Sequence, residues 1–464
     1  MEKRSERLLR PLFFWRAKHY AEGRSEPSFH RKHPKLAKGA PRAKQPSLSP
    51  ERIVEMSVIR AQCFRPILLL ACIFAASAPA VEAQSSRPRR VNPPETLLGP
   101  APKSPPVANR NAPLVDIRPA KPVGAGPVSA DTSHAYQLLQ QKQYAAAAKE
   151  AKQIAANYPT DPEAWKIAGF AELSLKQYAE ASSDLQKALD LQRAARQEDT
   201  HTVDALAEAY VLSENFEQAL PLLISATARQ AAKPDPVFLY YRGLSEFKTG
   251  KTKEAEQSFN AAIKLKPKDS ASLYFLGQMA LSRGDLDAAI AALNRATVSD
   301  PRLASAWASL TSAYLRRAGT AGDTPKADAD NSSAVRAGEG LTRVRTDEDA
   351  VRLFGQALIS AKLYPRAAAA LEPVSGPNAK AVTLYLLGVA HSRANNFPKA
   401  IAAFERANTK APEDLNVYRE LGYAFEKTKQ YAKAFALYQK ALQAAPDDPD
   451  FKESLERVRP AVKP

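Results

Sequence analysis

The sequence has little of what most enzymes use at their active sites. Its 464 residues include two cysteines and six histidines. It contains no H-E-x-x-H run for zinc, no C-x-x-C pair, no G-x-x-x-x-G-K-[ST] loop for phosphates and no G-x-S-x-G nucleophile turn. We therefore predict that the protein is not an enzyme and that it holds no cofactor and no metal.

A long apolar run is also missing. The apolar stretch from Ile67 to Ala76 has about half of the roughly 20 residues that a membrane-spanning helix needs. Arg60 and Arg65 precede this stretch, and Ala83 ends a small-residue cleavage motif, so residues 56–83 are interpreted as a secretory signal peptide. A buried core helix is the alternative. The interpretation predicts cleavage after Ala83, no stable membrane span afterwards, and a periplasmic or secreted protein.

The segments on either side of the predicted signal have no composition that would build a core. Residues 1–55 are basic and lack a hydrophobic period; they are expected to be a disordered extension, and Met56 is a candidate for the true start. Residues 84–127 contain 11 prolines and no aromatic residue, which predicts a disordered or extended linker. Both cysteines lie in or beside the signal, so the rest of the chain has no disulfide to form.

The positive charge is unevenly distributed. A net charge of +17 would ordinarily indicate a nucleic acid or an anionic membrane as partner. Residues 1–127, however, carry 23 Lys and Arg against 9 Asp and Glu, whereas residues 128–464 carry 43 against 40. We therefore predict no nucleic-acid partner for the main body, with an RNA-binding helical array as the alternative that the basic charge suggests.

The main body is built from a repeat of 34 residues. The repeat is clearest from Ala381 to Asp448, where eight residues recur at one fixed offset. The first copies are Leu384, Leu387, Gly388, Phe397, Ala400, Phe404, Ala407 and Pro412, and the second copies are Tyr418, Leu421, Gly422, Tyr431, Ala434, Tyr438, Ala441 and Pro446. A period of this length is typical of a solenoid, in which each unit buries its apolar face against the next.

Each repeat is expected to be a pair of helices. Leu384, Leu387 and Gly388 fall at i, i+3 and i+4, which places them on one side of a helix, and Ala400, Phe404 and Ala407 repeat that spacing on a second helix. Units phased in this way fill residues 128–448 and start near residues 128, 162, 200, 236, 270, 304, 348, 381 and 415.

This pattern resembles the tetratricopeptide repeat family. The resemblance implies an all-α fold, a right-handed α-solenoid of about nine antiparallel helical hairpins, whose first helices line a concave groove. Glu172 and Glu246 depart from the pattern, because they stand where the family has an aromatic residue.

Seven aspartates each stand directly before a unit. We predict that they cap the first helix of that unit rather than act as acids or bases. They are Asp161, Asp199, Asp235, Asp269, Asp347, Asp414 and Asp448. His391 occupies a repeat position where Phe425 and Tyr314 stand in other units, so it is interpreted as a packed core residue.

Two segments differ from the repeat. Residues 318–333 are small, polar and rich in Gly and Asp, which predicts a loop inserted into the sixth hairpin. After the ninth unit, Phe451, Leu455 and Val458 are spaced as on one side of a helix, so residues 449–464 are expected to form a helix that covers the last apolar surface.

The resemblance also locates a binding groove. It implies that the second, fifth, ninth and twelfth residues of each unit face the ligand, and the aromatic and arginine residues at these positions are the candidate contacts. They are Phe170, Tyr240, Phe247, Tyr274, Tyr385, Arg419 and Tyr423. The alternative is that the tyrosines pack between neighbouring helices. Lys166 and Phe170 do not form the Lys and Asn pair with which family members hold chaperone C-termini.

Together these observations predict a non-enzymatic scaffold of the bacterial cell envelope that binds another protein or a peptide in the groove. One alternative is an accessory factor for the assembly of exported polysaccharides, pili or outer-membrane receptors. Another is the substrate-recognition part of a glycosyltransferase complex. The pattern leaves self-association open.

Overall fold

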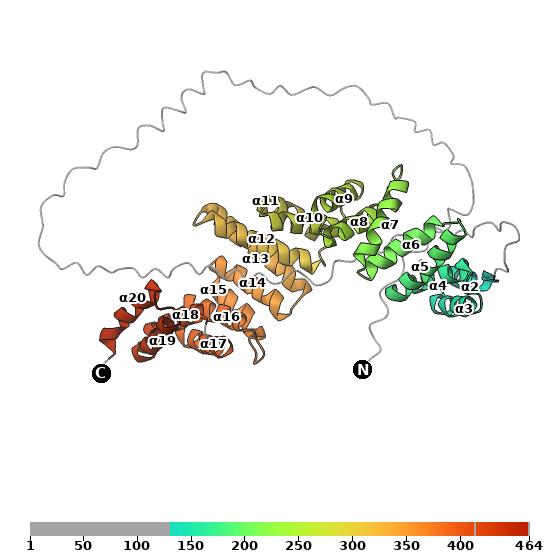
Figure 1. Ribbon diagram of the computed structural model, residues 1–464. Coiled ribbons are helices and arrows are strands. Elements are labelled where there is room, and N and C mark those ends of the chain that lie inside the picture. The colour runs from blue at the N-terminus through green and yellow to red at the C-terminus, as the bar shows by residue number, and fades with distance from the viewer. Residues whose placement is uncertain (1–129, 413, 463–464) are drawn as a thin grey trace, which may run out of the picture. The chain divides into compact units, whose positions relative to one another are not determined.

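The chain folds into helices that are joined in antiparallel pairs. The computed structural model describes residues 130–412 and 414–462, and all regular elements within these residues are helices (Figure 1). Consecutive helices pack on one another from α2 to α20, which confirms the prediction of an all-α solenoid of hairpins. The expectations for residues 1–55, 56–83 and 84–127 concern segments that lie outside the described residues.

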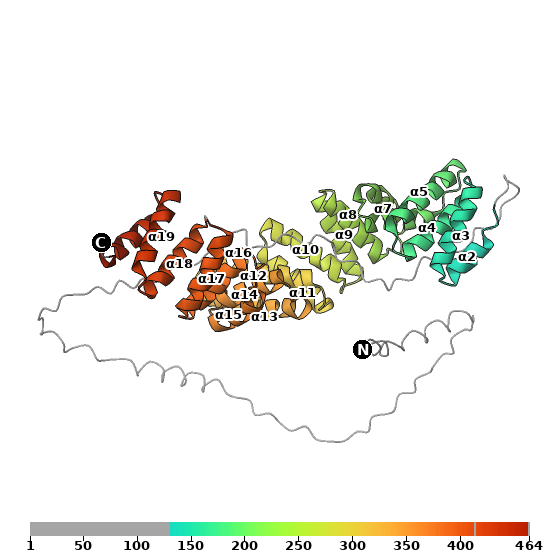
Figure 2. The ribbon, with the colours of Figure 1, turned by 90° about the horizontal axis from the view of Figure 1, so that it is seen from below.

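The helices of the described residues form nine hairpins. The hairpins follow one another in chain order (Figure 2). Their first helices are α2 (Ser133–Gln140), α4 (Pro162–Ser174), α6 (Thr200–Leu212), α8 (Pro236–Lys248), α10 (Ser270–Arg283), α12 (Ala304–Ala321), α14 (Glu348–Ser360), α16 (Ala381–Arg393) and α18 (Leu415–Lys427). Their second helices are α3 (Tyr144–Asn157), α5 (Tyr178–Ala194), α7 (Phe216–Arg229), α9 (Thr252–Leu265), α11 (Leu286–Ser299), α13 (Pro325–Val344), α15 (Tyr364–Leu371), α17 (Phe397–Lys410) and α19 (Tyr431–Ala444).

Three shorter elements complete the array. The 3-10 turn η2 (Glu372–Val374) follows α15, and α20 (Pro449–Val458) leads into the 3-10 turn η3 (Arg459–Ala461). Phe451 of α20 is fully buried and its ring lies 6.2 Å from that of Tyr438 on α19. Helix α20 therefore covers apolar surface of the ninth hairpin.

The seven aspartates act as helix caps, as the sequence predicts. In each case the side chain accepts a hydrogen bond from a backbone N–H two or three residues further on. Asp235, for example, accepts from the N–H of Val237 at 2.8 Å, and Pro236 takes the first helical position, where its missing N–H costs nothing.

The turn inside a hairpin depends on one residue in the left-handed conformation. Lys176 lies there with φ 64°, and the N–H of Gln177 donates back to the carbonyl of Glu172 at 2.9 Å. Gly250 and Gly284 take the same place in the fourth and fifth hairpins. This backbone geometry ends the first helix and reverses the chain within a few residues.

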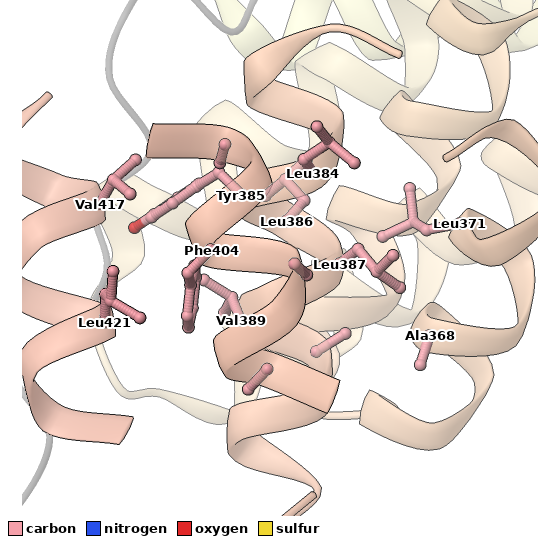
Figure 3. Packing of buried hydrophobic residues seen from close by; sticks show 14 of the residues in the cluster. Ala368, Leu371, Leu384, Tyr385, Leu386, Leu387, Val389, Phe404, Val417 and Leu421 are labelled. Carbon is pink, nitrogen blue, oxygen red and sulfur yellow. The ribbon is translucent and has the colours of Figure 1, made fainter. Parts of the chain in front are cut away.

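The two helices of a hairpin approach closely where a glycine faces a large residue. A Cβ added to Gly388 of α16 would lie 2.5 Å from the ring of Phe404 on α17, so only glycine fits there. Phe404 is fully buried and sits among leucines of the eighth hairpin and of its neighbours (Figure 3). The close approach explains why glycine recurs at this position of the repeat.

The predicted loop at residues 318–333 is wrong, because residues 318–321 and 325–333 are helical and only residues 322–324 form a turn. Helix α12 has 18 residues and α13 has 20, whereas the helices of the fourth hairpin have 13 and 14. Both helices of the sixth hairpin are therefore extended, and the turn between them is short. Arg317 pairs with the buried carboxylate of Asp330, with Nε 2.9 Å from Oδ2, which ties the two extensions together.

The sixth hairpin also differs from the others in where the small and the large residues of its helix contacts stand. Thr311 stands where most other first helices have glycine, and Gly338 of α13 faces Phe354 of α14. Gly340 of α13 lies against the ring of Trp307 on α12. Small polar residues that favour a loop in isolation are held in a helix here because the contact with α12 and α14 outweighs their weak helix propensity.

Candidate interaction surface

The candidate binding residues lie on the first helices of the hairpins. Residues at the second, fifth, ninth, twelfth and thirteenth positions of a unit are called the first-helix face below. Neighbouring first helices contact one another, for example α4 with α6, α10 with α12 and α16 with α18. Side chains from successive hairpins therefore lie beside one another on this face.

Four of the seven candidate residues are buried, so the idea that they line an open groove is wrong for them. Phe170, Tyr240 and Tyr274 are 2–3 % exposed and Tyr385 is 6 % exposed. Tyr385 extends from α16 toward Val417 of α18 (Figure 3). These four rings pack between neighbouring helices, which is the alternative that the sequence left open.

The side chain at the fifth position reaches toward the unit that follows. Lys166 Nζ lies 3.1 Å from Oδ2 of Asp199, and Arg419 Nη2 lies 3.0 Å from Oδ2 of Asp448. Asp199 and Asp448 are the caps of the following helices. A long side chain at this position therefore joins its own helix to the aspartate cap of the following unit. Lys166 is buried there, whereas the Arg419 side chain stays 39 % exposed.

The tyrosines at the fifth position follow the same geometry. Burial, with a contribution from the charge of Asp269, raises the pKa of Tyr240. Burial, together with the carboxylates of Glu420 and Asp414, raises the pKa of Tyr385. Asp269 and Asp414 are again caps of the next first helix, so these phenols stay protonated near neutral pH and serve packing.

The other three candidates remain half-exposed. Phe247 of α8 packs one side against Phe275, with the ring centres 5.5 Å apart. The ring of Tyr423 on α18 meets that of Phe397 edge-on at 6.3 Å, and Arg419 lies 4.9 Å above the ring of Phe451. Their contact with a ligand stays a prediction.

Several residues of this face were missed because only aromatic residues and arginines at four positions were considered. Burial raises the pKa of the Tyr274 phenol to about 12, and the neighbouring side chains of Ser305, Ser309 and Gln278 oppose this rise. Gln278 Nε2 donates to Ser309 Oγ at 2.5 Å, which links α10 to α12. Leu281 and Leu315, at the twelfth position, are half-exposed. The same repeat phasing would have identified Gln278, Leu281, Ser305 and Leu315, whereas Ser309 stands at the sixth position, outside this face.

The two glutamates that depart from the repeat pattern are buried and have partners. Glu172 pairs with Lys152, and Glu246 accepts from Ser258 Oγ at 2.6 Å and pairs with Arg242 at 2.8 Å. Burial raises the pKa of Glu172. The Glu172 pair joins α4 to α3 of the preceding hairpin, and the Glu246 contacts lie within the fourth hairpin, so both glutamates serve packing between helices.

Searches for other kinds of site were limited to the described residues. There, no three His, Cys, Asp or Glu side chains are grouped so that they could hold a metal ion. No helix of that part of the chain has both the length and the apolar character to cross a membrane.

Stacked hairpins whose first helices lie side by side define an α-solenoid of helical repeats. The family model described as "Tetratricopeptide repeat" matches residues 205–270, 240–304 and 385–449. The chain therefore contains tetratricopeptide repeats over these residues.

Several solved structures are similar to this chain. YrrB, described as a tetratricopeptide repeat protein with an unusual peptide-binding site, is 18% identical, with 43% of this chain and 97% of YrrB covered at a TM-score of 0.35. A tetratricopeptide repeat protein from Parabacteroides merdae is 15% identical. The comparison covers 56% of this chain and 98% of that protein, at a TM-score of 0.36. Human IFIT1, solved as a dimer with m7Gppp-AAAA, is 15% identical. The comparison covers 68% of this chain and 81% of IFIT1, at a TM-score of 0.35. No curated protein matches the chain.

Proposed function

We propose that the protein is a non-enzymatic scaffold that binds a peptide or a partner protein on the first-helix face. The tetratricopeptide repeat fold is generally a non-catalytic, protein-binding scaffold. The observation that carries the proposal for this chain is the half-exposed state of Phe247, Arg419 and Tyr423, which lie on that face and are of the residue types that dominate interface energetics.

We further propose that the scaffold works in the bacterial cell envelope. The support is the signal-like sequence of residues 56–83. Cell fractionation, with N-terminal sequencing of the exported form, tests this. A mature terminus near Gln84 in the envelope fraction is expected, and a full-length chain confined to the cytoplasm contradicts it.

Photo-crosslinking in cells tests the binding surface. A photoreactive residue placed at Phe247 or Tyr423 is expected to trap a discrete partner. The control is the same residue at Val298, which is 80 % exposed on the second helix α11 and lies outside the first-helix face. Equal trapping from Val298, or no trapping from either test position, contradicts the proposal.

The identity of the trapped partner separates the scaffold from its alternatives. A component of polysaccharide, pilus or outer-membrane receptor assembly indicates an accessory factor, and a glycosyltransferase indicates a recognition subunit. RNA trapped in place of protein contradicts the proposal of a protein partner. The near-neutral charge of residues 128–464, which carry 43 Lys and Arg against 40 Asp and Glu, leads us to expect no such result.

A further inference from the structure

The fourth, fifth and sixth hairpins present a distinct part of the first-helix face. Phe247, Leu281 and Leu315 occupy the twelfth position of α8, α10 and α12, and all three are half-exposed. With Gln278, Ser312 and Arg316 they form what is called the central strip below. It combines a row of apolar side chains with neighbouring amide and hydroxyl groups.

The three helices that carry the central strip contact one another, α8 with α10 and α10 with α12. Arg316 Nη1 of α12 donates to the carbonyl of Leu281 on α10 at 3.3 Å, which brings the thirteenth position of one helix next to the twelfth of its neighbour. Phe247 contacts the buried Phe275 of α10, so α8 packs against the helix that carries Leu281. Leu281 and Leu315 each pack one side into the core, and their remaining surface is open to solvent.

The charged residues of this part of the first-helix face are all positive. Among the residues at its five positions on α8, α10 and α12 there is no Asp or Glu, whereas Lys248 and Arg316 are cations. The neighbouring first helices differ, because α6 contributes Asp204 and Glu208.

Arg316 differs from the arginines around it. Arg317 pairs with Asp330, and Arg393 pairs with Glu420. Within the part of the chain that the structure describes, Arg316 has no carboxylate partner, and one of its five N–H donors goes to the Leu281 carbonyl. The remaining donors are available to a ligand, and a carboxylate is the group that guanidinium binds best in two-point geometry.

We propose that the central strip binds an extended segment of a partner protein in which apolar side chains alternate with carboxylates. The apolar side chains lie on Phe247, Leu281 and Leu315, the carboxylates face Arg316 and Lys248, and Gln278 and Ser312 hydrogen-bond the backbone of the segment. Crossing two helix spacings of about 9 Å each takes about six residues of extended chain. The inference rests on the proposed scaffold function and names the chemistry of its ligand.

Fluorescence anisotropy on the full-length protein tests the chemistry. The probe is a labelled peptide of about eight residues in which leucine and glutamate alternate, a length set by the span of the strip. Two comparison peptides alternate leucine with lysine and serine with glutamate. The first probe is expected to bind about tenfold more tightly than either comparison peptide, and added salt is expected to weaken its binding.

A pair of variants tests the site. Arg316→Glu is expected to weaken binding of the leucine–glutamate peptide about tenfold or more. Arg336→Glu is the matched control, because Arg336 is exposed on α13 of the same hairpin and lies outside the strip. Circular dichroism and thermal melting of both variants verify that the fold is kept. Leu315→Ser adds a second reading that does not depend on charge, and it is also expected to weaken binding.

Three results would overturn the inference: equal affinity of the Arg316 and Arg336 variants, equal binding of the lysine peptide, or no binding of any peptide. Crosslinking separates this failure from failure of the scaffold function. A partner trapped from Tyr423 whose capture survives Arg316→Glu leaves the scaffold in place and removes the strip as its binding site. The absence of any partner from Phe247 and Tyr423 removes the scaffold function itself.

Discussion

Arg393 of α16 and Glu420 of α18 form a two-point ion pair across neighbouring hairpins, with Nη2 2.7 Å from Oε1 and Nη1 3.0 Å from Oε2. The side chains are only 14 % and 10 % exposed. Burial opposes the charge of Arg393, but the Glu420 carboxylate outweighs it and raises the pKa of the guanidinium. The eighth and ninth hairpins are thus joined by a charge pair as well as by apolar packing.

Removing one partner of this pair is expected to destabilise the C-terminal hairpins. Arg393→Ala leaves the Glu420 carboxylate buried without its cation, which should lower the free energy of unfolding by about 3 kcal/mol. Chemical denaturation of Arg393→Ala, Glu420→Gln and the double variant measures the coupling between them. A loss no larger than that for an exposed pair, about 0.5 kcal/mol, contradicts the structure here.

Gly388 and Gly319 are expected to respond in opposite directions to alanine. The new Cβ at Gly388 would lie 2.5 Å from Phe404, so Gly388→Ala should cost about 1–3 kcal/mol through overpacking. Gly319 lies in α12 with nothing within 4 Å of its Cβ position, so Gly319→Ala should raise stability by about 0.5–1 kcal/mol. Thermal melting of both variants checks the sign. Addition of Phe404→Leu to Gly388→Ala is expected to restore part of the loss.

Each aspartate cap is expected to contribute a similar amount to the free energy of unfolding. Asp235→Ala removes the acceptor for the Val237 N–H and is expected to cost about 1 kcal/mol, whereas Asp235→Asn should keep most of the stability. The control is Asp447→Ala, because the Asp447 side chain is fully exposed. A cost of Asp235→Ala equal to that of the control would show that the cap does not stabilise α8.

His391 should make the stability of the array depend on pH. It is buried, as the sequence predicts for a core position; burial lowers its pKa, Lys399 also lowers it, and Glu372 at 3.5 Å opposes this. Because the pKa in the folded state lies below the ordinary value of 6.5, the folded state binds the proton less readily than the unfolded chain. The corresponding stability is present above about pH 6.5 and is lost as the pH falls below it.

His391→Phe removes this dependence, since phenylalanine occupies the equivalent position in the ninth hairpin as Phe425. Melting temperatures measured from about pH 8 to about pH 5 are expected to fall more steeply for the native protein than for the variant. Parallel curves for the two proteins would show that His391 does not carry the effect.

The sequence by itself determined the repeating parts of the fold. A hairpin buries its apolar side only against the next copy, so the same residue types recur at the same positions, and a fixed period makes them visible. Gly388, Phe404 and the aspartate caps such as Asp235 are examples. Each has a role that local geometry defines, and each was assigned correctly from its place in the repeat.

Only the tertiary structure decided how much of the first-helix face is open. Tyr240 and Phe247 stand on the same helix at positions assigned to one groove, yet Tyr240 is buried and Phe247 is half-exposed. Both rings contact Phe275 of the next hairpin, but Tyr240 also packs against Phe259 of its own hairpin, with ring centres 6.1 Å apart. Position in a repeat does not reveal how closely the neighbouring helices enclose a side chain.

The sixth hairpin shows the same limit for local sequence. Residues 318–333 have the composition of a loop, and their helix propensity alone does not favour α12 and α13 at their observed lengths. The ion pair of Arg317 with Asp330 and the close contact of Gly340 with Trp307 supply the missing stabilisation. These contacts join residues on two different helices, so they form only when the helices lie side by side. The period of the repeat, in contrast, can be read from the sequence alone.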